Sequence, residues 1–190
     1  MLTVIAGWIS VEDQAIQSIC AVISSTLFTF GEGFSESSSS LIGNMIGANR
    51  VGYAWHYAQA MTPLSILMTI LVLIPLFNNM HEMADLFTSE PGMRELLMQV
   101  LPILLICFFF DVLQQQSKGV IRGLNLQRGA VWITLIGYYV VAIPVGLCFA
   151  FRQGKGVEGL RAGVLVGQLV LVTLQSILID CLTNWQNIAH

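Results

Sequence analysis

The stretch that decides the fold is residues 96–120, which read LLMQVLPILLICFFFDVLQQQSKGV. A helix that crosses a membrane needs about 20 predominantly apolar residues, and this stretch supplies most of them before it turns polar. The whole chain has the same character, because 55% of its 190 residues are hydrophobic and 10% are charged. Soluble domains carry about 25% charged residues. We therefore predict an integral membrane protein that contacts the lipid bilayer.

Four further long apolar stretches accompany this one, and a short apolar stub at residues 2–9 precedes them. The five predicted spans cover residues 15–48, 53–77, 96–120, 130–151 and 160–182. The stub is too short to cross a bilayer alone. The expected fold class is an all-α membrane protein, a polytopic bundle of about five transmembrane helices plus the stub. Such a multi-pass protein belongs in the plasma membrane or an organelle membrane, and the sequence does not choose between them.

Charge and motifs exclude several classes of function. The chain has 8 Lys and Arg against 11 Asp and Glu, a net charge of -3, with no basic stripe for nucleic acid. Its four cysteines stand singly, without the paired spacing of a zinc site, and are expected to be small buried hydrophobes. GxSxG, HExxH and P-loop patterns are also missing. We expect no enzyme, no metal site and no cofactor.

The first predicted span contains a polar interruption. Gly31-Glu32-Gly33 is followed by Glu36 and by the serine run 37–40, so we expect a helix with a flexible, polar break. Glu32 and Glu36 stand four residues apart and face one direction if the segment is helical. Two interpretations remain open. Either the two acids line a watery cavity, or the break lies near a membrane surface and both acids are solvated.

Asp111 is the sharpest candidate for a functional group. An ionised carboxylate inside a span costs several kcal/mol unless it is paired or hydrated. Helical spacing places Gln114 or Gln115, Lys118 and Arg122 on roughly the same face as Asp111. A carboxylate in such surroundings is able to alternate between a proton and a cation, as a proton-coupled antiporter requires. The alternative is that Asp111 bonds to the glutamines and anchors helix packing.

Tyr138 and Tyr139 lie in the middle of the fourth span, where their rings are able to face a cationic ligand. Trp132 is explained more simply as an anchor at the membrane interface. The candidate cavity-lining residues around Asp111 are therefore Gln114, Gln115, Lys118, Glu32, Glu36, Tyr138 and Tyr139.

Glycines recur at the spacing that lets membrane helices approach closely. Such small-xxx-small patterns occur at Gly43 and Gly47, at Gly119 and Gly123, and at Gly159, Gly163 and Gly167. We predict that these are packing seams.

Several of these residues also form ordered motifs. Gly119-Val120-Ile121-Arg122-Gly123 is followed by Gly137-Tyr138-Tyr139 and then by Ile143-Pro144-Val145-Gly146. In order and spacing these resemble the tenth and eleventh helices of eukaryotic members of the multidrug and toxic compound extrusion (MATE) family. The eighth helix of the family is similar to the stretch with Gly31, Gly33 and Gly43-Asn44. The twelfth is similar to the stretch from Gly156-Val157 to Gly159-Leu160 with Asn184-Trp185. The likeness spans nearly the whole chain.

The resemblance implies that the five spans are helices eight to twelve of a twelve-helix, two-lobe fold. Residues 1–190 then form a single, incomplete C-terminal lobe, and the stub is the end of helix seven. Asp111 corresponds to the acid in helix ten that binds protons or cations. The implied function is a proton-coupled antiporter that exports organic cations, drugs or toxic metabolites by alternating access, with sodium coupling less favoured.

Two departures from the family pattern matter. Members usually carry a further acid in helix seven, which this chain lacks, while Glu32 and Glu36 stand where small or apolar residues are usual. The first lobe is also absent, so we expect a fragment, a truncated gene model or a half-transporter that pairs with an N-terminal lobe or a partner subunit. The alternative function is a non-transporting or vestigial membrane subunit whose glycine seams bind partner helices.

Overall fold

The computed structural model describes residues 11–152 and 156–182, and every element in this part of the chain is a helix. The stub at residues 2–9 and the Asn184-Trp185 pair lie outside the described residues. In chain order the elements are α2 (Val11–Gly47), α3 (Val51–Asn78), α4 (Met80–Phe87), α5 (Pro91–Gly123), α6 (Gln127–Leu135), η1 (Ile136–Ala142), α7 (Ile143–Leu147), η2 (Cys148–Arg152), α8 (Gly156–Ile177) and η3 (Leu178–Leu182).

Five helical segments are long and apolar enough to cross a membrane. They cover Gln14–Gly47, Val51–Asn78, Pro91–Gly123, Gln127–Arg152 and Val157–Asp180. The fourth combines α6, η1, α7 and η2, and the fifth combines α8 with η3. The predicted all-α membrane fold with five spans is confirmed.

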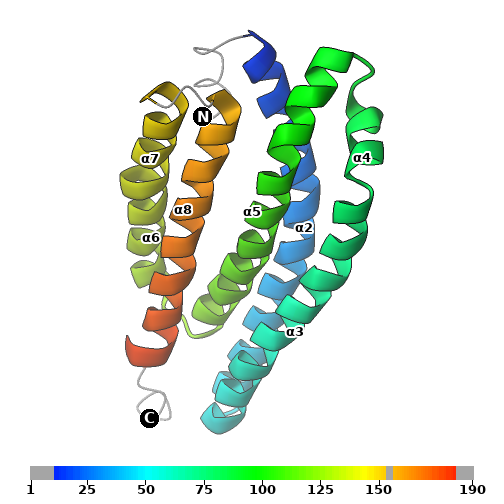
Figure 1. Ribbon diagram of the computed structural model, residues 1–190. Helices are drawn as coiled ribbons and strands as arrows, with labels where there is room; N and C mark the ends of the chain where they lie inside the picture. The colour runs from blue at the N-terminus through cyan, green and yellow to red at the C-terminus, as the bar shows by residue number, and fades with distance from the viewer. Residues whose placement is uncertain (1–10, 153–155, 183–190) are drawn as a thin grey trace.

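Helix α5 runs through the middle of the bundle (Figure 1). Helices α2, α3 and α4 lie on one side of it, and α8 lies on the other, backed by α6, η1 and α7. Leu101, Leu104 and Leu105 of α5 are buried against Ile16 of α2 and Leu160 of α8. The apolar half of α5 is therefore the core of the bundle, and its polar half, from Asp111 onward, continues between the same neighbours.

Helix α2 is continuous from Val11 to Gly47, and the prediction of a polar break around Gly31 was wrong. Two side-chain contacts lie in this segment. Gly31 faces Gln115 of α5, since a Cβ placed on the glycine would lie 3.3 Å from Gln115 Cγ. Ser37 donates a hydrogen bond of 2.8 Å to the carbonyl of Gly33 one turn earlier. Packing against α5 thus outweighs the low intrinsic helix propensity of the two glycines.

Two of the three predicted glycine seams lie at helix contacts. Gly119 meets the backbone of Ser35 on α2, where an added Cβ would lie 2.7 Å from Ser35 Cα. Gly159 meets η2 in the same way, with Ala150 N at 2.7 Å from such a Cβ. Gly47, in contrast, has nothing within 4 Å. The third seam, at residues 43 and 47, therefore makes no comparable contact.

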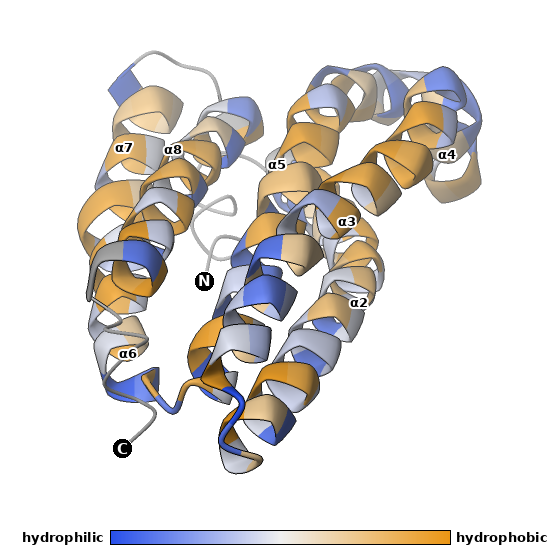
Figure 2. Ribbon diagram, turned by 90° about the horizontal axis from the view of Figure 1, so that it is seen from below, coloured by the Kyte–Doolittle hydropathy of each residue, from blue (hydrophilic) through white to orange (hydrophobic). Residues whose placement is uncertain are grey.

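The outward faces of α2 and α3 differ in polarity (Figure 2). Along α3 the exposed side chains are mostly large and apolar, among them Tyr53, Leu64, Leu67, Leu71 and Ile74. Along α2 the exposed positions are mostly small or polar, among them Ser18, Ser25, Thr29, Glu32 and Glu36. The face of α3 suits lipid tails, whereas the face of α2 suits water or a protein surface.

The fourth span winds more loosely at η1. Pro144 has no N–H to donate, and Ile143 N–H bonds the carbonyl of Tyr138 five residues earlier. Such π-type turns are frequent at functional sites. Tyr138 is one of the residues of this turn.

Candidate functional site

Asp111 lies on α5 in the middle of the bundle, partly buried, at the boundary with α8. Gln168 of α8 donates a hydrogen bond of 2.6 Å from its Nε2 to the Asp111 Oδ1. Among the described residues Asp111 forms no ion pair. The carboxylate therefore has an amide partner inside a membrane span and no cation bonded to it.

Gln114, one turn further along α5, brings in the fourth span. Tyr138 of η1 donates its hydroxyl to Gln114 Oε1 over 3.1 Å. Gln114 is 1% exposed, and its Nε2 has no hydrogen-bond partner within the described part of the chain. The Oε1 of Gln168 is also buried without a hydrogen-bond partner in this part of the chain. Asp111, Gln114, Tyr138 and Gln168 form a polar cluster that joins α5, η1 and α8, and we call it the Asp111 cluster.

A second group of charges lies toward α2, further along the same face of α5. Arg122 forms an ion pair with Glu36, and both side chains are exposed. Lys118 lies close enough to Asp111 and to Glu32 to interact with both electrostatically. Lys118 and Arg122 also line a groove of about 310 Å³ between α5 and α6. Glu32 and Glu36 are thus exposed acids of a continuous helix that faces two cations of α5.

Two of the residues predicted to line a cavity lie elsewhere. Gln115 is buried and packs against Gly31 of α2. Tyr139 is 59% exposed, whereas its neighbour Tyr138 reaches Gln114. The structure therefore places the Gln114–Tyr138 pair one helical turn from Asp111, whereas Gln115 packs against α2 and Tyr139 is exposed.

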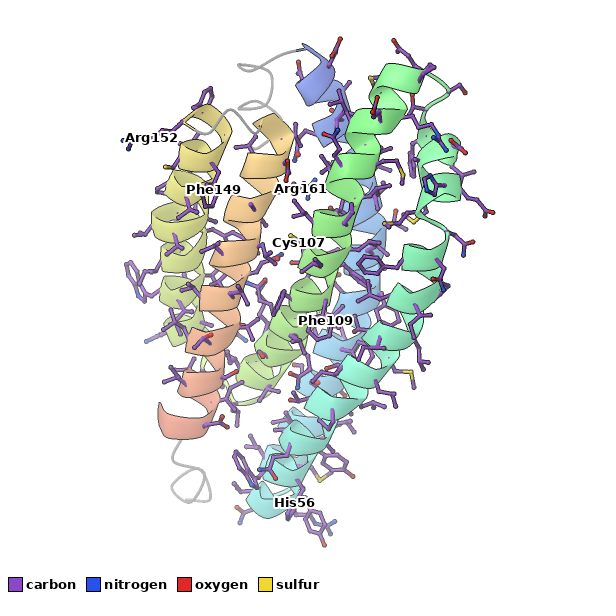
Figure 3. All side chains as sticks on the ribbon, in the orientation of Figure 1. His56, Cys107, Phe109, Phe149, Arg152 and Arg161 are labelled. Carbon is purple, nitrogen blue, oxygen red and sulfur yellow. The ribbon has the colours of Figure 1, made fainter. Side chains whose placement is uncertain are left out.

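Sequence reasoning missed the polar side of α8. Arg161 is 6% exposed, donates from Nη1 to Ser24 Oγ of α2 over 3.2 Å, and leaves its Nε without a partner in the described chain. Figure 3 shows Arg161 on the part of α8 that faces α5, near Cys107, whose Sγ lies 3.9 Å from the Arg161 carbonyl. A signal was present, because Arg161, Gln168 and Gln175 recur every seven residues and so share one helical face.

Among the described residues, no three His, Cys, Asp or Glu side chains are grouped closely enough to hold a metal ion. The cluster is instead made of one carboxylate, two amides and a phenol. These groups are suited to exchange protons and to accept hydrogen bonds or cations.

The MatE family model matches residues 1–148. The chain belongs to the MatE family. Human Multidrug and toxin extrusion protein 1 is 27% identical to this MatE chain over 162 residues, which cover 85% of the chain and 28% of the human protein. Mouse Multidrug and toxin extrusion protein 2 is 30% identical over 191 residues, which cover 99% of this chain and 33% of the mouse protein. Protein DETOXIFICATION 37 of Arabidopsis thaliana is 27% identical over 187 residues, which cover 97% of this chain and 37% of the plant protein.

Solved structures agree with this assignment. The eukaryotic MATE transporter AtDTX14 superposes with a TM-score of 0.89 at 25% identity, over 94% of this chain and 40% of that one. An inward-facing and an outward-facing structure of multidrug resistance MATE family transporters superpose with TM-scores of 0.83 and 0.88, at 20% and 18% identity. The last two show the fold alone. The MatE chain spans about a third of the length of these curated relatives. The predicted family resemblance is confirmed.

Proposed function

We propose that this chain supplies the Asp111-bearing lobe of a proton-coupled antiporter that exports organic cations, drugs or toxic metabolites by alternating access. The observation that carries the proposal is the Asp111 carboxylate, which lies in a membrane span and has Gln168 as its hydrogen-bond partner. An ionised carboxylate so placed is stabilised by taking up a proton or a cation. The names of the curated relatives, which refer to multidrug and toxin extrusion, support the substrate class.

The amide of Gln168 suits both protonation states of Asp111. The ionised carboxylate accepts from Gln168 Nε2, while Gln168 Oε1 has no partner in the described chain. When Asp111 takes up a proton it becomes a donor, and rotation of the amide by half a turn presents Oε1 as the acceptor. The cluster therefore keeps one hydrogen bond through a proton cycle.

The cation enters the same cycle in competition with the proton. Ionised Asp111 attracts an organic cation, and the ring of Tyr138, held by Gln114, offers an aromatic face beside it. Protonation removes the negative charge and so lowers the affinity for the cation. Release is further favoured by Lys118, which lies within electrostatic range of Asp111. If the inward-facing and outward-facing conformations bind the proton and the cation with different affinities, proton uptake drives release of the cation on one side of the membrane.

A chimera tests the proposal, with this chain replacing the matching segment of AtDTX14. Proteoliposomes loaded with tetraethylammonium are given an outside-acidic pH gradient, and efflux is measured. The parent chimera should export the cation in a gradient-dependent way, and Asp111→Asn should abolish that dependence. Asp111→Glu should retain part of it. Gradient-driven efflux of normal rate from Asp111→Asn would reject Asp111 as the coupling group.

The alternative, a non-transporting membrane subunit, is supported by Gly33 and Gly47 of α2, whose Cβ positions have no described neighbour within 4 Å and so leave room for a partner helix. It is tested with the 190-residue chain alone. Purification in mild detergent with one unrelated protein in fixed stoichiometry, together with no efflux from the chimera, would favour this second function. Recovery with an N-terminal MATE-like lobe would favour the antiporter.

A further inference from the structure

A cavity lined by polar and apolar side chains lies on the side of α5 away from Asp111. It has a volume of about 480 Å³ and opens between α3, α5 and the segment formed by α8 and η3. On α5 it is lined by Leu113, Gln116 and Val120, which 3.6 residues per turn place roughly opposite Asp111. Ligand pockets typically have volumes of about 300–1,000 Å³. We call this cavity the α3–α8 pocket, and it is separate from the Asp111 cluster.

Gln116 lines the pocket and carries a hydrogen-bond donor without a described partner. Its side chain is 2% exposed, and Thr62 of α3 donates to its Oε1 over 3.5 Å. The Nε2 of the same amide has no hydrogen-bond partner among the described residues. Leaving a buried donor without an acceptor is costly. The pocket therefore offers a hydrogen bond to an acceptor oxygen that a ligand brings.

Asp180 gives the pocket its charge. Of the side chains that line the pocket in the described part of the chain, that of Asp180 is the charged one. It stands exposed at the end of the fifth span, and Trp55 near the start of α3 lines the same cavity. A carboxylate and an indole ring together suit an organic ammonium ion. A ligand anion would meet no basic lining residue here.

The remaining walls suit an apolar body. Ile66 of α3, Leu113 of α5 and Val172 of α8 line the cavity between the polar groups. The first turns of α3 and the end of η3 lie at the same end of the bundle (Figure 1). The charged part of the pocket is thus at one boundary of the spans, and its apolar part extends toward their middle.

We propose that the α3–α8 pocket binds an organic ammonium ion that carries an acceptor oxygen on an apolar body. The ammonium lies against Asp180 and Trp55, and the oxygen accepts from Gln116 Nε2. A choline ester dissolved in water and the choline headgroup of a membrane lipid share this chemistry. The site goes beyond the proposed transport function, because it does not use Asp111.

Equilibrium binding to the whole chain tests this site. The chain is placed in phosphatidylglycerol nanodiscs and titrated with radiolabelled butyrylcholine, with empty nanodiscs as background. We expect saturable binding that Asp180→Asn weakens by about tenfold or more. Gln116→Leu should weaken butyrylcholine by about tenfold and change tetrabutylammonium, which has no acceptor oxygen, by less than about twofold. All titrations use an Asp111→Asn background, so that cation binding at the Asp111 cluster does not contribute. Glu82→Gln on α4, which does not line the pocket, is the matched acid-to-amide control and should bind butyrylcholine normally.

A second variant guards against loss of folding. Ser176 is exposed and lines the pocket, so Ser176→Phe should fill the cavity and abolish binding while circular dichroism stays unchanged. Replacing the phosphatidylglycerol with phosphatidylcholine then shows whether the natural ligand is a lipid headgroup or a soluble ammonium ion. Weaker butyrylcholine binding points to the lipid headgroup, and unchanged binding points to a soluble ammonium ion. The proposal is overturned if binding in the Asp111→Asn background does not saturate, or if Asp180→Asn in that background binds normally.

Discussion

Helix α5 meets α2 and α8 in two different ways. Against α2 the backbones come together at Gly119, where even a methyl group would lie 2.7 Å from Ser35 Cα. Against α8 the contact is made by polar side chains, among them Asp111 and Gln168. The first interface depends on the absence of side-chain volume, whereas the second depends on hydrogen-bond partners that are able to change. The α2 contact is therefore the fixed one, and the α8 contact is the one suited to a working cycle.

Unpartnered polar atoms occur at both interfaces. Ser35 and Ser38 of α2, and Gln168 and Gln175 of α8, each have a buried side-chain atom without a hydrogen-bond partner in the described chain. The distinction therefore rests on the contacts themselves, which are backbone at Gly119 and side-chain hydrogen bonds at Asp111. We expect substitutions on the α2 side to affect folding and those on the α8 side to affect both folding and function.

The largest effect is expected from Gly119→Val, which places side-chain volume against the Ser35 backbone. Overpacking a closed contact costs about 1–3 kcal/mol and occasionally more, and we expect about 3 kcal/mol or more here because the neighbour is backbone. Unfolding by sodium dodecyl sulfate in mixed micelles, followed by circular dichroism, measures this loss.

Gly33→Ala is the matched control for Gly119→Val. Gly33 also lies within a long helix, but nothing approaches its Cβ position within 4 Å. The alanine should leave stability unchanged or raise it by up to about 1 kcal/mol, since glycine is a poor helix former. Equal stability of Gly119→Val and the parent protein would show that close approach does not hold α2 against α5.

The α8 interface should respond less strongly. Gln168→Leu removes the donor to Asp111 and leaves a carboxylate in the span without its hydrogen bond. Leaving a buried acceptor unsatisfied costs about 1–3 kcal/mol, and more if it is charged. The same unfolding assay at pH 7 measures this. Gln175→Leu provides the contrast, because both polar atoms of Gln175 lack partners in the described chain, and it should be neutral or stabilising. A large loss from Gln175→Leu alone would contradict this account of the interface.

The sequence predicts the helices of this protein better than it predicts their partners. Apolar runs of about 20 residues are a local property, so five spans follow from composition. Whether Gly31 breaks α2 depends on Gln115, more than 80 residues away along the chain. The prediction failed there because local propensity was outweighed by packing. Membrane helices tolerate glycine wherever a neighbour fits against it.

The candidate site was predicted only in part, because some of its features are local in the sequence and others depend on packing between helices. Asp111 stands out locally as a charge in an apolar run, and Tyr138 as a mid-span aromatic residue. That Gln168 binds Asp111, while Gln115 faces α2, depends on how α5 is rotated among its neighbours. Periodicity gives the face that a residue occupies, but it does not say which helix covers that face.

The ion pair between Glu36 and Arg122 should contribute little, although it also joins α2 to α5. Both side chains are exposed, at 71% and 45%, and exposed pairs are worth about 0.2–1 kcal/mol. A double-mutant cycle with Glu36→Gln and Arg122→Gln measures the coupling, and addition of salt should reduce it. A coupling well above 1 kcal/mol would mean that charge, and not only backbone approach, fixes the α2 interface.

The contact of α5 with α4 extends the comparison to a third helix and should give the smallest effect. Asp85 of α4 lies outside the predicted spans and forms an ion pair with Arg94 at the start of α5. The hydrogen bonds from the Arg94 guanidinium, assisted by its charge, hold the pKa of Asp85 below its usual value. A lowered folded-state pKa stabilises the protein fully above the unfolded-state pKa of about 3.9, and this contribution disappears as the pH falls through the folded-state pKa.

Asp85→Asn should therefore lower the Tm slightly at pH 7 and leave it equal to that of the parent protein near pH 2. Because both partners are largely exposed, the difference at pH 7 should shrink further in 1 M salt, where the Debye length is about 3 Å. Glu82→Gln on the same helix is the control, since it removes an acid without touching Arg94. A Tm difference for Asp85→Asn that persists unchanged at low pH would mean that the carboxamide disturbs α4 itself. The α4 contact would then depend on side-chain shape, as the α2 contact does, and not on charge.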